Sequence, residues 1–194
     1  DWFCFPHFDS PSVFAPILDD EKCGHFRIAP TAKDIESKQS YWPDTNVLVT
    51  RFLGTDGAAE VTDFMPAGPA TGHAYHQLVR IVKAIRGSVQ LKMECRPAFN
   101  YGRSDHETEL RYHTASFRSP ELSMLLRSTV ELAGDGPGVA SVFTLSEGQT
   151  AVFALDELQS DDDLDTSANE ADAAGLFHMT VDYWQRWLSR CTYT

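Results

Sequence analysis

The sequence predicts an all-β protein, an antiparallel β-sandwich followed by an acidic linker and one C-terminal α-helix. Short segments of alternating apolar and polar residues are separated by turn residues, and no helical period occurs before residue 160. Strands alternating with helices would indicate a parallel sheet, and that pattern is absent. A closed barrel is the alternative arrangement of such strands. We expect the sandwich over residues 1–156, the linker over 157–175 and the helix over 176–191.

The clearest strand is Ser88–Arg96, in which apolar side chains alternate with polar ones. This period of two is typical of a strand with one buried face. The segment Leu122–Leu132 repeats the pattern and predicts a second long strand. Further strands are predicted over Trp2–Phe8, Phe26–Ala29, Val47–Leu53, Glu60–Met65, Leu78–Ile85, Arg111–Phe117, Val139–Leu145 and Ala151–Leu155.

Three short turn sequences predict hairpins between successive strands. They are Gly54–Gly57, Arg86–Gly87 and Glu147–Gln149, each between two apolar runs. Each of these hairpins would place the two flanking strands side by side in one sheet.

The predicted linker is rich in carboxylates and poor in apolar residues, which indicates a solvated segment. The run Asp161–Asp165 could also be interpreted as a calcium loop. It lacks the Gly turn and the terminal Glu of an EF-hand, so we expect no metal there.

The C-terminal segment has an apolar stripe at steps of three and four residues, which predicts an amphipathic helix. The stripe contains Phe177, Val181, Trp184, Leu188 and Cys191, with Trp187 beside it. Its face is wider than one sheet surface usually covers. Two interpretations remain open: a helix buried on this sandwich, or a helix shared with another domain.

Composition and charge exclude several classes of partner. The chain has 194 residues, a mass of 21.6 kDa and 42% hydrophobic residues, enough for a sizeable core. Its net charge of −12 disfavours nucleic acid and anionic membrane surfaces. No segment carries the roughly 20 consecutive apolar residues that cross a bilayer. Because the chain begins Asp1-Trp2-Phe3 without Met or a leader, we expect it to be part of a longer protein.

The four cysteines, Cys4, Cys23, Cys95 and Cys191, form no CxxC pair, so no zinc site is indicated. We expect reduced thiols, with Cys95 on the apolar face of a strand and Cys191 on the apolar face of the helix. The sequence also lacks an Asn-x-Ser/Thr site, which favours a cytoplasmic protein.

The sequence shows no recognisable catalytic motif, and we expect no cofactor and no catalytic residue in this chain. The histidines of His73–His76 and the turn Asp105–Glu107 are expected to face water. Two clusters of aromatic and polar residues, Asp1–Ser12 and Arg96–Arg103, have the side chains that bind carbohydrate. The alternative is that the aromatics belong to the core and the polar groups cap turns.

At these clusters the sequence resembles the trehalase-like N-terminal domain of glycoside hydrolase family 15, the group of glucoamylase-like and trehalase enzymes. The resemblance implies an antiparallel super-sandwich that is joined by a helix to an α/α barrel. In that family the barrel carries both catalytic Glu residues and hydrolyses α-glucosidic bonds with inversion. His7 departs from the family, which usually has Arg there, and the family's first strand is missing. The matching segments are Asp1–Phe14, Pro43–Leu48, Glu60–Pro66, Met93–Pro97, Tyr101–Arg103 and Tyr183–Leu188.

The resemblance implies a non-catalytic accessory domain that stabilises the barrel and shapes the substrate entrance. The alternative is a sandwich module that binds glucans by itself. The expected partners are the C-terminal barrel, an α-glucoside ligand and a second copy of the chain. Trp184 or Trp187, or both, should be exposed in the isolated chain. The residues expected at a substrate or interdomain interface are Trp2, His7, Asp9, Arg96, Tyr101, Arg103, Trp184 and Trp187.

Overall fold

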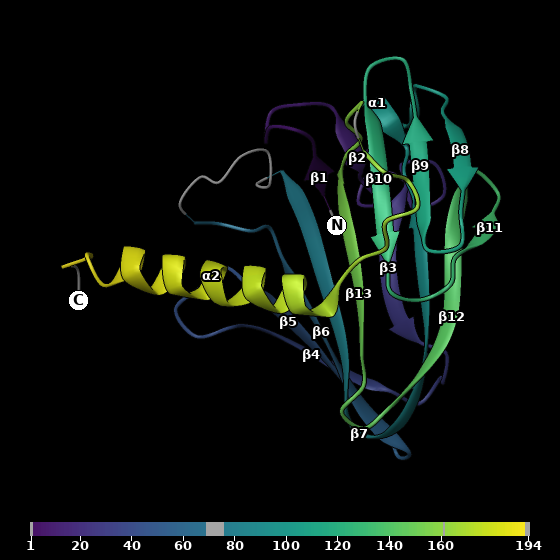
Figure 1. Cartoon of the computed structure of the whole chain (residues 1–194). Coiled ribbons are helices and arrows are strands. Elements are labelled where there is room, and N and C mark those ends of the chain that lie inside the picture. The colour runs from purple at the N-terminus through teal and green to yellow at the C-terminus, as the bar shows by residue number, and fades with distance from the viewer. Residues whose placement is uncertain (1, 69–75, 161, 193–194) are drawn as a thin grey trace.

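Two antiparallel sheets face each other and share one long strand, β7 (Gln77–Arg96), while the helix α2 (Glu170–Leu188) extends to one side (Figure 1). The computed structural model describes residues 2–68, 76–160 and 162–192. The predicted class is confirmed: the chain is mostly strand, antiparallel throughout, with one long helix near its C-terminus.

The larger sheet contains the first half of β7, and the smaller sheet contains its second half. A separate two-stranded ribbon, β1 (Phe3–Cys4) with β2 (Ser12–Phe14), lies at one end of the sandwich. The smaller sheet adds β3 (His25–Pro30), β12 (Gly138–Ser146) and β11 (Ala133–Asp135). The larger sheet runs in the order β4 (Glu36–Tyr41), β5 (Leu48–Leu53), β6 (Gly57–Phe64), β7, β13 (Thr150–Glu157), β10 (Ser123–Ser128), β9 (Thr114–Arg118), β8 (Glu107–Leu110).

The predicted hairpin at Arg86–Gly87 is wrong, because β7 continues through these residues and passes from one sheet to the other. Its first half pairs with β6 and β13, whereas its second half pairs with β12 and β3. Gly87 has φ +63°, and a Cβ there would collide with the carbonyl oxygen of Asp56. Glycine therefore permits both the bend and the close approach of the β5–β6 turn.

The turn Glu147–Gln149 also connects the two sheets and is not a hairpin. It joins β12 to β13, which pair with the two different halves of β7 and not with each other. The Glu147 and Gly148 N–H groups donate to the carbonyls of Gly87 and Ala84, so this turn stacks on the bend of β7. The third predicted hairpin, Gly54–Gly57, is confirmed by the antiparallel pairing of β5 with β6.

The bounds of several strands differ from the prediction. The prediction used alternating apolar residues, whereas strands pair through backbone hydrogen bonds, which do not require an apolar face. The edge strand β4 is exposed along its whole length and shows no alternation, so sequence periodicity missed it. The predicted strand Leu122–Leu132 ends at Ser128. Only Phe3–Cys4 of the predicted strand Trp2–Phe8 pairs, since the chain turns at Pro6, which has no N–H to donate.

The main core lies between the two sheets and confirms the predicted inward face of the second half of β7. Val89, Leu91, Met93 and Cys95 are all buried there, opposite side chains of the larger sheet. Large side chains with almost no exposed surface fill the space between the layers: Phe5, Phe14, Phe117, Phe153, Met124, Leu126 and Leu155.

A partly buried ion pair joins the two sheets across this core, and sequence patterning did not indicate it. Arg80 on β7 donates to both carboxylate oxygens of Asp63 on β6, from Nε (2.8 Å) and Nη2 (3.0 Å). Its Nη1 donates to the carbonyl of Phe26 on β3, and its guanidinium lies over the Phe26 ring. The Asp63 carboxylate pairs the charge and three of the five guanidinium N–H groups have partners, so the arginine can lie between the sheets.

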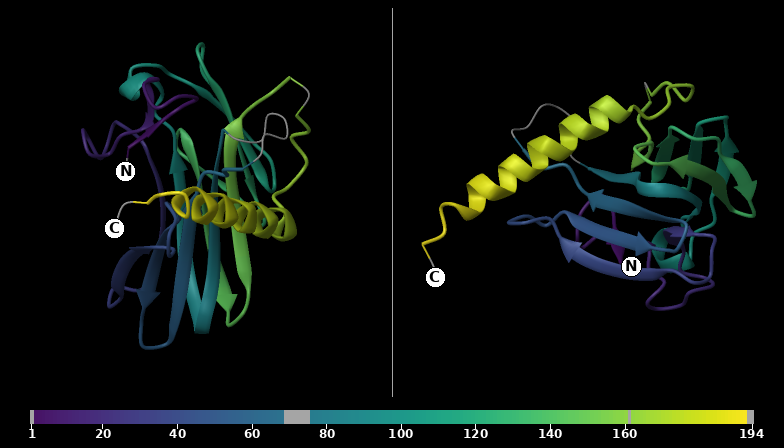
Figure 2. Two further views of the ribbon diagram at one scale, coloured as in Figure 1. Left: turned by 90° about the vertical axis from the view of Figure 1, so that its left-hand side faces the viewer. Right: turned by 90° about the horizontal axis from the view of Figure 1, so that it is seen from below.

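The outer face of the larger sheet carries a second core, which the first half of α2 covers (Figure 2). Phe177 packs edge-on against Trp42 and Phe64, and Thr180 accepts a hydrogen bond from the Ala67 N–H (3.1 Å). The set also contains Val47, Val79, Val152, Ala173, Leu176 and Val181.

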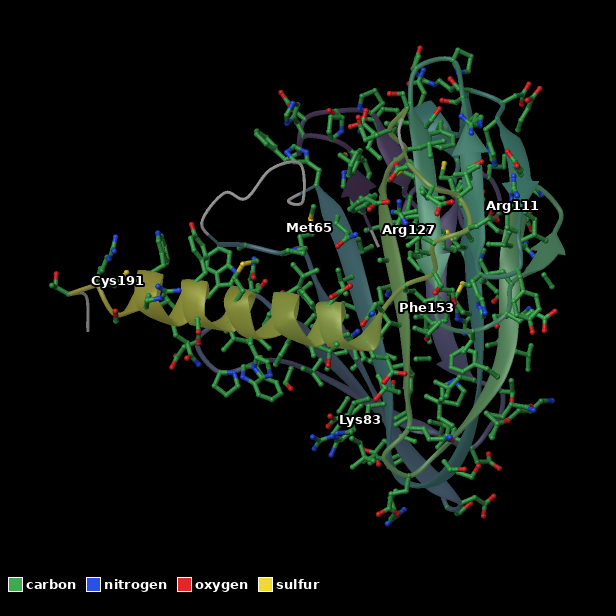
Figure 3. All side chains as sticks on the ribbon, in the orientation of Figure 1. Met65, Lys83, Arg111, Arg127, Phe153 and Cys191 are labelled. Carbon is green, nitrogen blue, oxygen red and sulfur yellow. The ribbon has the colours of Figure 1, made fainter. Side chains whose placement is uncertain are left out.

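The helix begins at Glu170, earlier than the predicted start at residue 176. Asn169 caps it by accepting from the N–H groups of Ala171 (2.8 Å) and Asp172 (3.2 Å). Two acidic residues of the predicted linker, Glu170 and Asp172, lie in the first turn of the helix, near the positive end of its dipole. The helix ends at Leu188, so Cys191 is exposed beyond it and not on its apolar face (Figure 3).

Neither helix in the described ranges is long and apolar enough to cross a membrane.

We expect Gly87→Ala to lower the free energy of unfolding by about 2–4 kcal/mol, because it adds a backbone collision to an unfavourable positive φ. Urea-induced unfolding measures the loss. Gly148→Ala is the matched control, since Gly148 has φ +84° but open space around its Cβ position, and it should cost about 1 kcal/mol. Equal losses in the two variants would show that the bend tolerates a side chain.

Candidate functional site

The two aromatic and polar clusters predicted from the sequence meet at one end of the sandwich. The short turn α1 (Phe99–Gly102) lies beside β2, and the Ala98 N–H donates to the carbonyl of Val13 (2.9 Å). In the ribbon β1–β2 the rings of Phe3 and Phe14 pack against each other at a tilt, with centroids 5.8 Å apart. Residues far apart in the sequence therefore form one surface.

The turn α1 has a left-handed backbone. Asn100, Tyr101 and Gly102 have φ of +52°, +60° and +73°. A non-glycine residue in this region is uncommon and costs free energy, and such strain is often found at functional sites. The Cys23 thiol lies 3.8 Å from the Tyr101 carbonyl, and Gly102 lies too close to the Lys22 carbonyl to carry a Cβ.

A cavity of about 280 Å³ lies where the clusters meet. The N-terminal loop supplies Pro6 and Ser10, β2 supplies Ser12, and α1 supplies Phe99 and Asn100. The other wall comes from Ser119, Glu121 and Leu122, in the turn between β9 and β10, and from Glu157 at the end of β13. The sequence did not predict this second wall, because no motif links these positions to the aromatic clusters.

Three of the predicted interface residues lie together outside the cavity. The rings of Trp2 and Tyr101 are 6.0 Å apart, and the Arg103 guanidinium lies 6.0 Å from the Tyr101 ring. Trp2 is 52% exposed, and its Nε1 donates to the Cys4 sulfur (3.1 Å). This aromatic surface, Trp2–Tyr101–Arg103, could stack against a sugar ring.

The remaining predicted residues of these clusters have other environments. His7 is exposed and its ring packs edge-on against His76, whose Nδ1 lies 3.1 Å from the Pro6 carbonyl oxygen. His76 is thus a loop contact, whereas His73 lies outside the described residues. Asp9 is exposed, in the turn after Phe8, which is 93% exposed.

Arg96 holds the edge of the smaller sheet and does not reach the cavity. Its Nη2 donates to Asp135 (2.6 Å) and lies 4.0 Å from Glu94. The guanidinium holds the pKa of the Asp135 carboxyl below its ordinary value. Arg96 therefore joins β7 to β11, and its position assigns it a structural role.

His106 corrects the expectation that Asp105–Glu107 faces water. Its ring is half-buried between Phe99 and Phe117, with centroids 5.3 and 5.9 Å away. Its Nε2 lies 2.8 Å from the Pro137 carbonyl oxygen. These aromatic contacts explain why the His106 ring is half-buried, whereas Asp105 and Glu107 beside it are exposed.

The C-terminal half of α2 carries an aromatic surface that the described residues leave partly exposed, which we call the helix end: Tyr183, Trp184, Trp187 and Leu188. Trp187 is 50% exposed, which confirms the prediction that at least one of the two tryptophans is exposed. Trp184 packs against both Tyr183 and Trp187. Its Nε1 is buried without a hydrogen-bond partner among the described residues.

The linker that leads to α2 is anchored to the sheet by Arg127 on β10 (Figure 3). Arg127 donates through Nη1 to Asp156 (2.8 and 2.9 Å) and through Nη2 to Asp162 (2.5 Å). The Thr114 hydroxyl donates to the carbonyl of Leu164 farther along the linker. These contacts fix the direction in which the helix leaves the sandwich.

The acidic run is engaged in local contacts. Asp162 pairs with Arg127 and Asp165 with Arg111, while Asp163 accepts from the Asp165 N–H and the Thr166 hydroxyl. Asp161 lies outside the described residues. Across the described part of the chain, no group of three or more His, Cys, Asp or Glu side chains is arranged to hold a metal ion.

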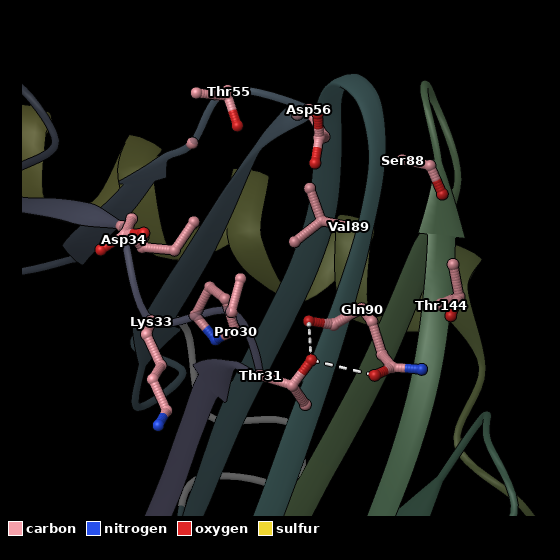
Figure 4. Close-up of a pocket in the computed structure, with 14 residues that line it drawn as sticks. Pro30, Thr31, Lys33, Asp34, Thr55, Asp56, Ser88, Val89, Gln90 and Thr144 are labelled. Atoms are coloured by element: carbon pink, nitrogen blue, oxygen red, sulfur yellow. Dashed lines mark hydrogen bonds between the residues drawn. The ribbon is translucent and has the colours of Figure 1, made fainter.

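A larger pocket of about 450 Å³ lies at the bend of β7 (Figure 4). Its polar wall includes Thr31, whose hydroxyl donates to the Gln90 side-chain oxygen (2.9 Å). Lys33, Asp34 and Asp56 add charges of both signs. None of its lining residues is aromatic, so it lacks the ring surface that sugar binding favours.

Comparisons with known proteins agree with the resemblance. The family model described as "Trehalase-like, N-terminal" matches residues 1–133. A trehalase of Thermoplasma acidophilum is 29% identical over 100% of this chain and 33% of its own length. Trehalase 1 of Sulfolobus acidocaldarius is 30% identical over 95% of the chain and 30% of its own length. A trehalase of Mycolicibacterium smegmatis is 30% identical, with 97% and 31% covered. The chain thus spans about a third of the length of these relatives.

The pH dependence of stability should report on the Arg127 anchor. Burial, together with the second carboxylate on Arg127, raises the pKa of Asp156 to about 6. The unfolded chain binds this proton only near pH 4. The folded state therefore holds more protons between about pH 4 and 6, and the contribution of Asp156 to stability falls as pH rises through 6.

We expect Asp156→Asn to remove this component, which amounts to at most about 3 kcal/mol. The difference in the free energy of unfolding, variant minus wild type, should therefore rise as the pH increases from 4 to 7. Urea unfolding across that range measures it. Asp165→Asn, which removes an exposed carboxylate of the same linker, should keep the wild-type profile. Parallel curves for wild type and Asp156→Asn would contradict the raised pKa.

Proposed function

The chain belongs to the trehalase-like N-terminal family, and we propose that it is the non-catalytic accessory domain of a larger family 15 glycoside hydrolase. The substrate of that enzyme would be an α-glucoside, either trehalose or a malto-oligosaccharide. The lengths of the relatives support this role. Trehalases about three times as long as this chain align with nearly all of it over about one third of their own length.

The helix end is the observation that carries the proposal. Among the described residues, α2 packs on the outer core of the sheet as far as Val181, and its remaining part extends beyond the sandwich (Figure 2). Exposed Trp187, Tyr183 and Leu188 with the buried, unpartnered Trp184 Nε1 resemble half of an interface. Tryptophan and tyrosine are enriched at such anchor positions.

The proposed partner is a C-terminal α/α barrel of the same protein, which would hold the catalytic residues. The anchored linker and the capped helix would present the helix end to the barrel in one fixed direction. The aromatic surface Trp2–Tyr101–Arg103 would then be available to shape the substrate entrance. A cytoplasmic location fits the four free thiols.

A second candidate function is a β-sandwich module that binds glucans by itself. The aromatic surface Trp2–Tyr101–Arg103 favours it, because an exposed Trp2 ring and a half-buried Tyr101 ring beside a guanidinium offer both stacking and hydrogen-bond donors.

We expect the isolated chain to hydrolyse neither trehalose nor maltose, whereas the longer protein that contains it should hydrolyse one of them. Glucose release, followed over hours at high protein concentration, measures both. Hydrolysis by the isolated chain would contradict the accessory role, and loss of that activity in Glu121→Gln or Glu157→Gln would assign it to the cavity.

In the longer protein, Trp187→Ala should lower the melting temperature by several degrees, as expected for an aromatic anchor worth about 2 kcal/mol. In the isolated chain the same change should cost no more than about 0.5 kcal/mol. Tyr112→Ala is the control, because Tyr112 is an exposed aromatic residue of the β8–β9 turn. Equal effects in the two proteins, or a dimer of the isolated chain that Trp187→Ala dissociates, would contradict docking on a barrel.

A further inference from the structure

The cavity between the N-terminal loop, α1 and the β9–β10 turn has the composition of a ligand site. Pro6, Pro11 and Leu122 supply accessible apolar surface, and Asn100, Glu121 and Glu157 supply accessible polar groups. Phe5, Phe99 and Ser12 also line the cavity but have almost no exposed surface. Its volume of about 280 Å³ lies just below the range of roughly 300–1,000 Å³ that holds drug-sized ligands. A single ring with its substituents fits this space better than an extended chain.

Ser12 provides an independent indication of a ligand. The residue has 0% exposed surface, it lines the cavity, and its hydroxyl has no hydrogen-bond partner among the described residues. Burying a hydroxyl without a partner costs free energy, so most buried polar groups in folded proteins are paired. Ser12 has no exposed surface, so a ligand hydroxyl in the cavity would supply the missing partner once the neighbouring lining side chains move aside.

Charge decides the chemical class of the ligand. Glu121 and Glu157 are the charged residues of the lining, no lining residue is Lys, Arg or His, and neither glutamate forms an ion pair with a described residue. Ionised carboxylates carry negative charge, so they repel phosphate and sulfate. Their oxygens only accept hydrogen bonds, so they bind hydroxyl donors. The Asn100 amide adds both a donor and an acceptor.

We propose that this cavity binds one ring of a neutral sugar. The ring's apolar C–H surface would lie against Pro6, Pro11 and Leu122, and its hydroxyl groups would hydrogen-bond to Asn100 and the two glutamates. A shift of the lining on binding would bring one hydroxyl to Ser12. The proposal deepens the second candidate function by assigning a site that is distinct from the surface Trp2–Tyr101–Arg103. It is independent of the accessory role, which requires no sugar in the sandwich.

The test is calorimetric titration of the whole 194-residue chain with glucose and with trehalose up to about 50 mM, supported by ligand-observed saturation-transfer NMR. We expect saturable binding at millimolar concentration. Ser12→Ala should weaken binding about five- to tenfold, the effect of losing one hydrogen bond. Sodium phosphate at the same concentrations should not bind, because the lining is acidic.

Ser116→Ala is the matched control. Ser116 is also a buried serine without a partner, but it lies on β9 and does not line the cavity. Thermal melts of both variants should match the wild type, which shows that each is folded. Absence of saturable sugar binding, or equal weakening by Ser12→Ala and Ser116→Ala, would overturn the proposal.

Trp2→Ala separates the cavity from the second candidate function. If sugar binding is lost in Trp2→Ala and unchanged in Ser12→Ala, the module binds glucan on its aromatic surface and the cavity assignment is wrong. If Ser12→Ala weakens binding and Trp2→Ala does not, the cavity is the site. Tighter binding of phosphate than of glucose would also overturn the proposal.

Discussion

The passage of β7 from one sheet to the other is the constraint on which the rest of the fold depends. Its two halves contribute to opposite walls of the main core, so the bend at Gly87 sets how the sheets face each other. The connection between β12 and β13 makes the same crossing beside it and hydrogen-bonds to the bend. Both crossings depend on a backbone that only glycine adopts without strain, with φ of +63° at Gly87 and +84° at Gly148.

Two groups of ion pairs add to the apolar packing of the sheets. Arg80 and Asp63 lie between the sheets, where the Arg80 guanidinium also reaches the backbone of β3. Arg127 performs a comparable task on the outer face by holding two carboxylates, one from β13 and one from the linker. Removing Asp63 would leave the Arg80 charge between the sheets without its partner, which costs more than the pair contributes. These contacts select one arrangement of the linker and helix.

The same framework places the two candidate functional surfaces in different environments. The cavity lies at the end of the sandwich, where a strained turn and an N-terminal loop bring Asn100 and Ser12 to one wall. The helix end lies outside the sandwich, where nothing described covers Trp187. One accessory domain can contain both a sugar-sized cavity and an aromatic docking surface. A sugar can bind in the cavity whether or not the helix end is docked on a partner.

The sequence by itself determined the all-β class, the inward face of Val89–Cys95, the amphipathic helix and an exposed tryptophan near its end. Each follows from local periodicity, which records the side chains that must avoid water. Only the tertiary structure decided that Arg86–Gly87 and Glu147–Gln149 connect sheets, since a turn sequence is the same whether its strands pair with each other or with others. It also decided that α2 begins at Glu170 and that Ser12, Asn100, Glu121 and Glu157 share one cavity. Such long-range juxtapositions arise from strand order, and the spacing of residues along a single chain does not encode strand order in a form that periodicity can reveal.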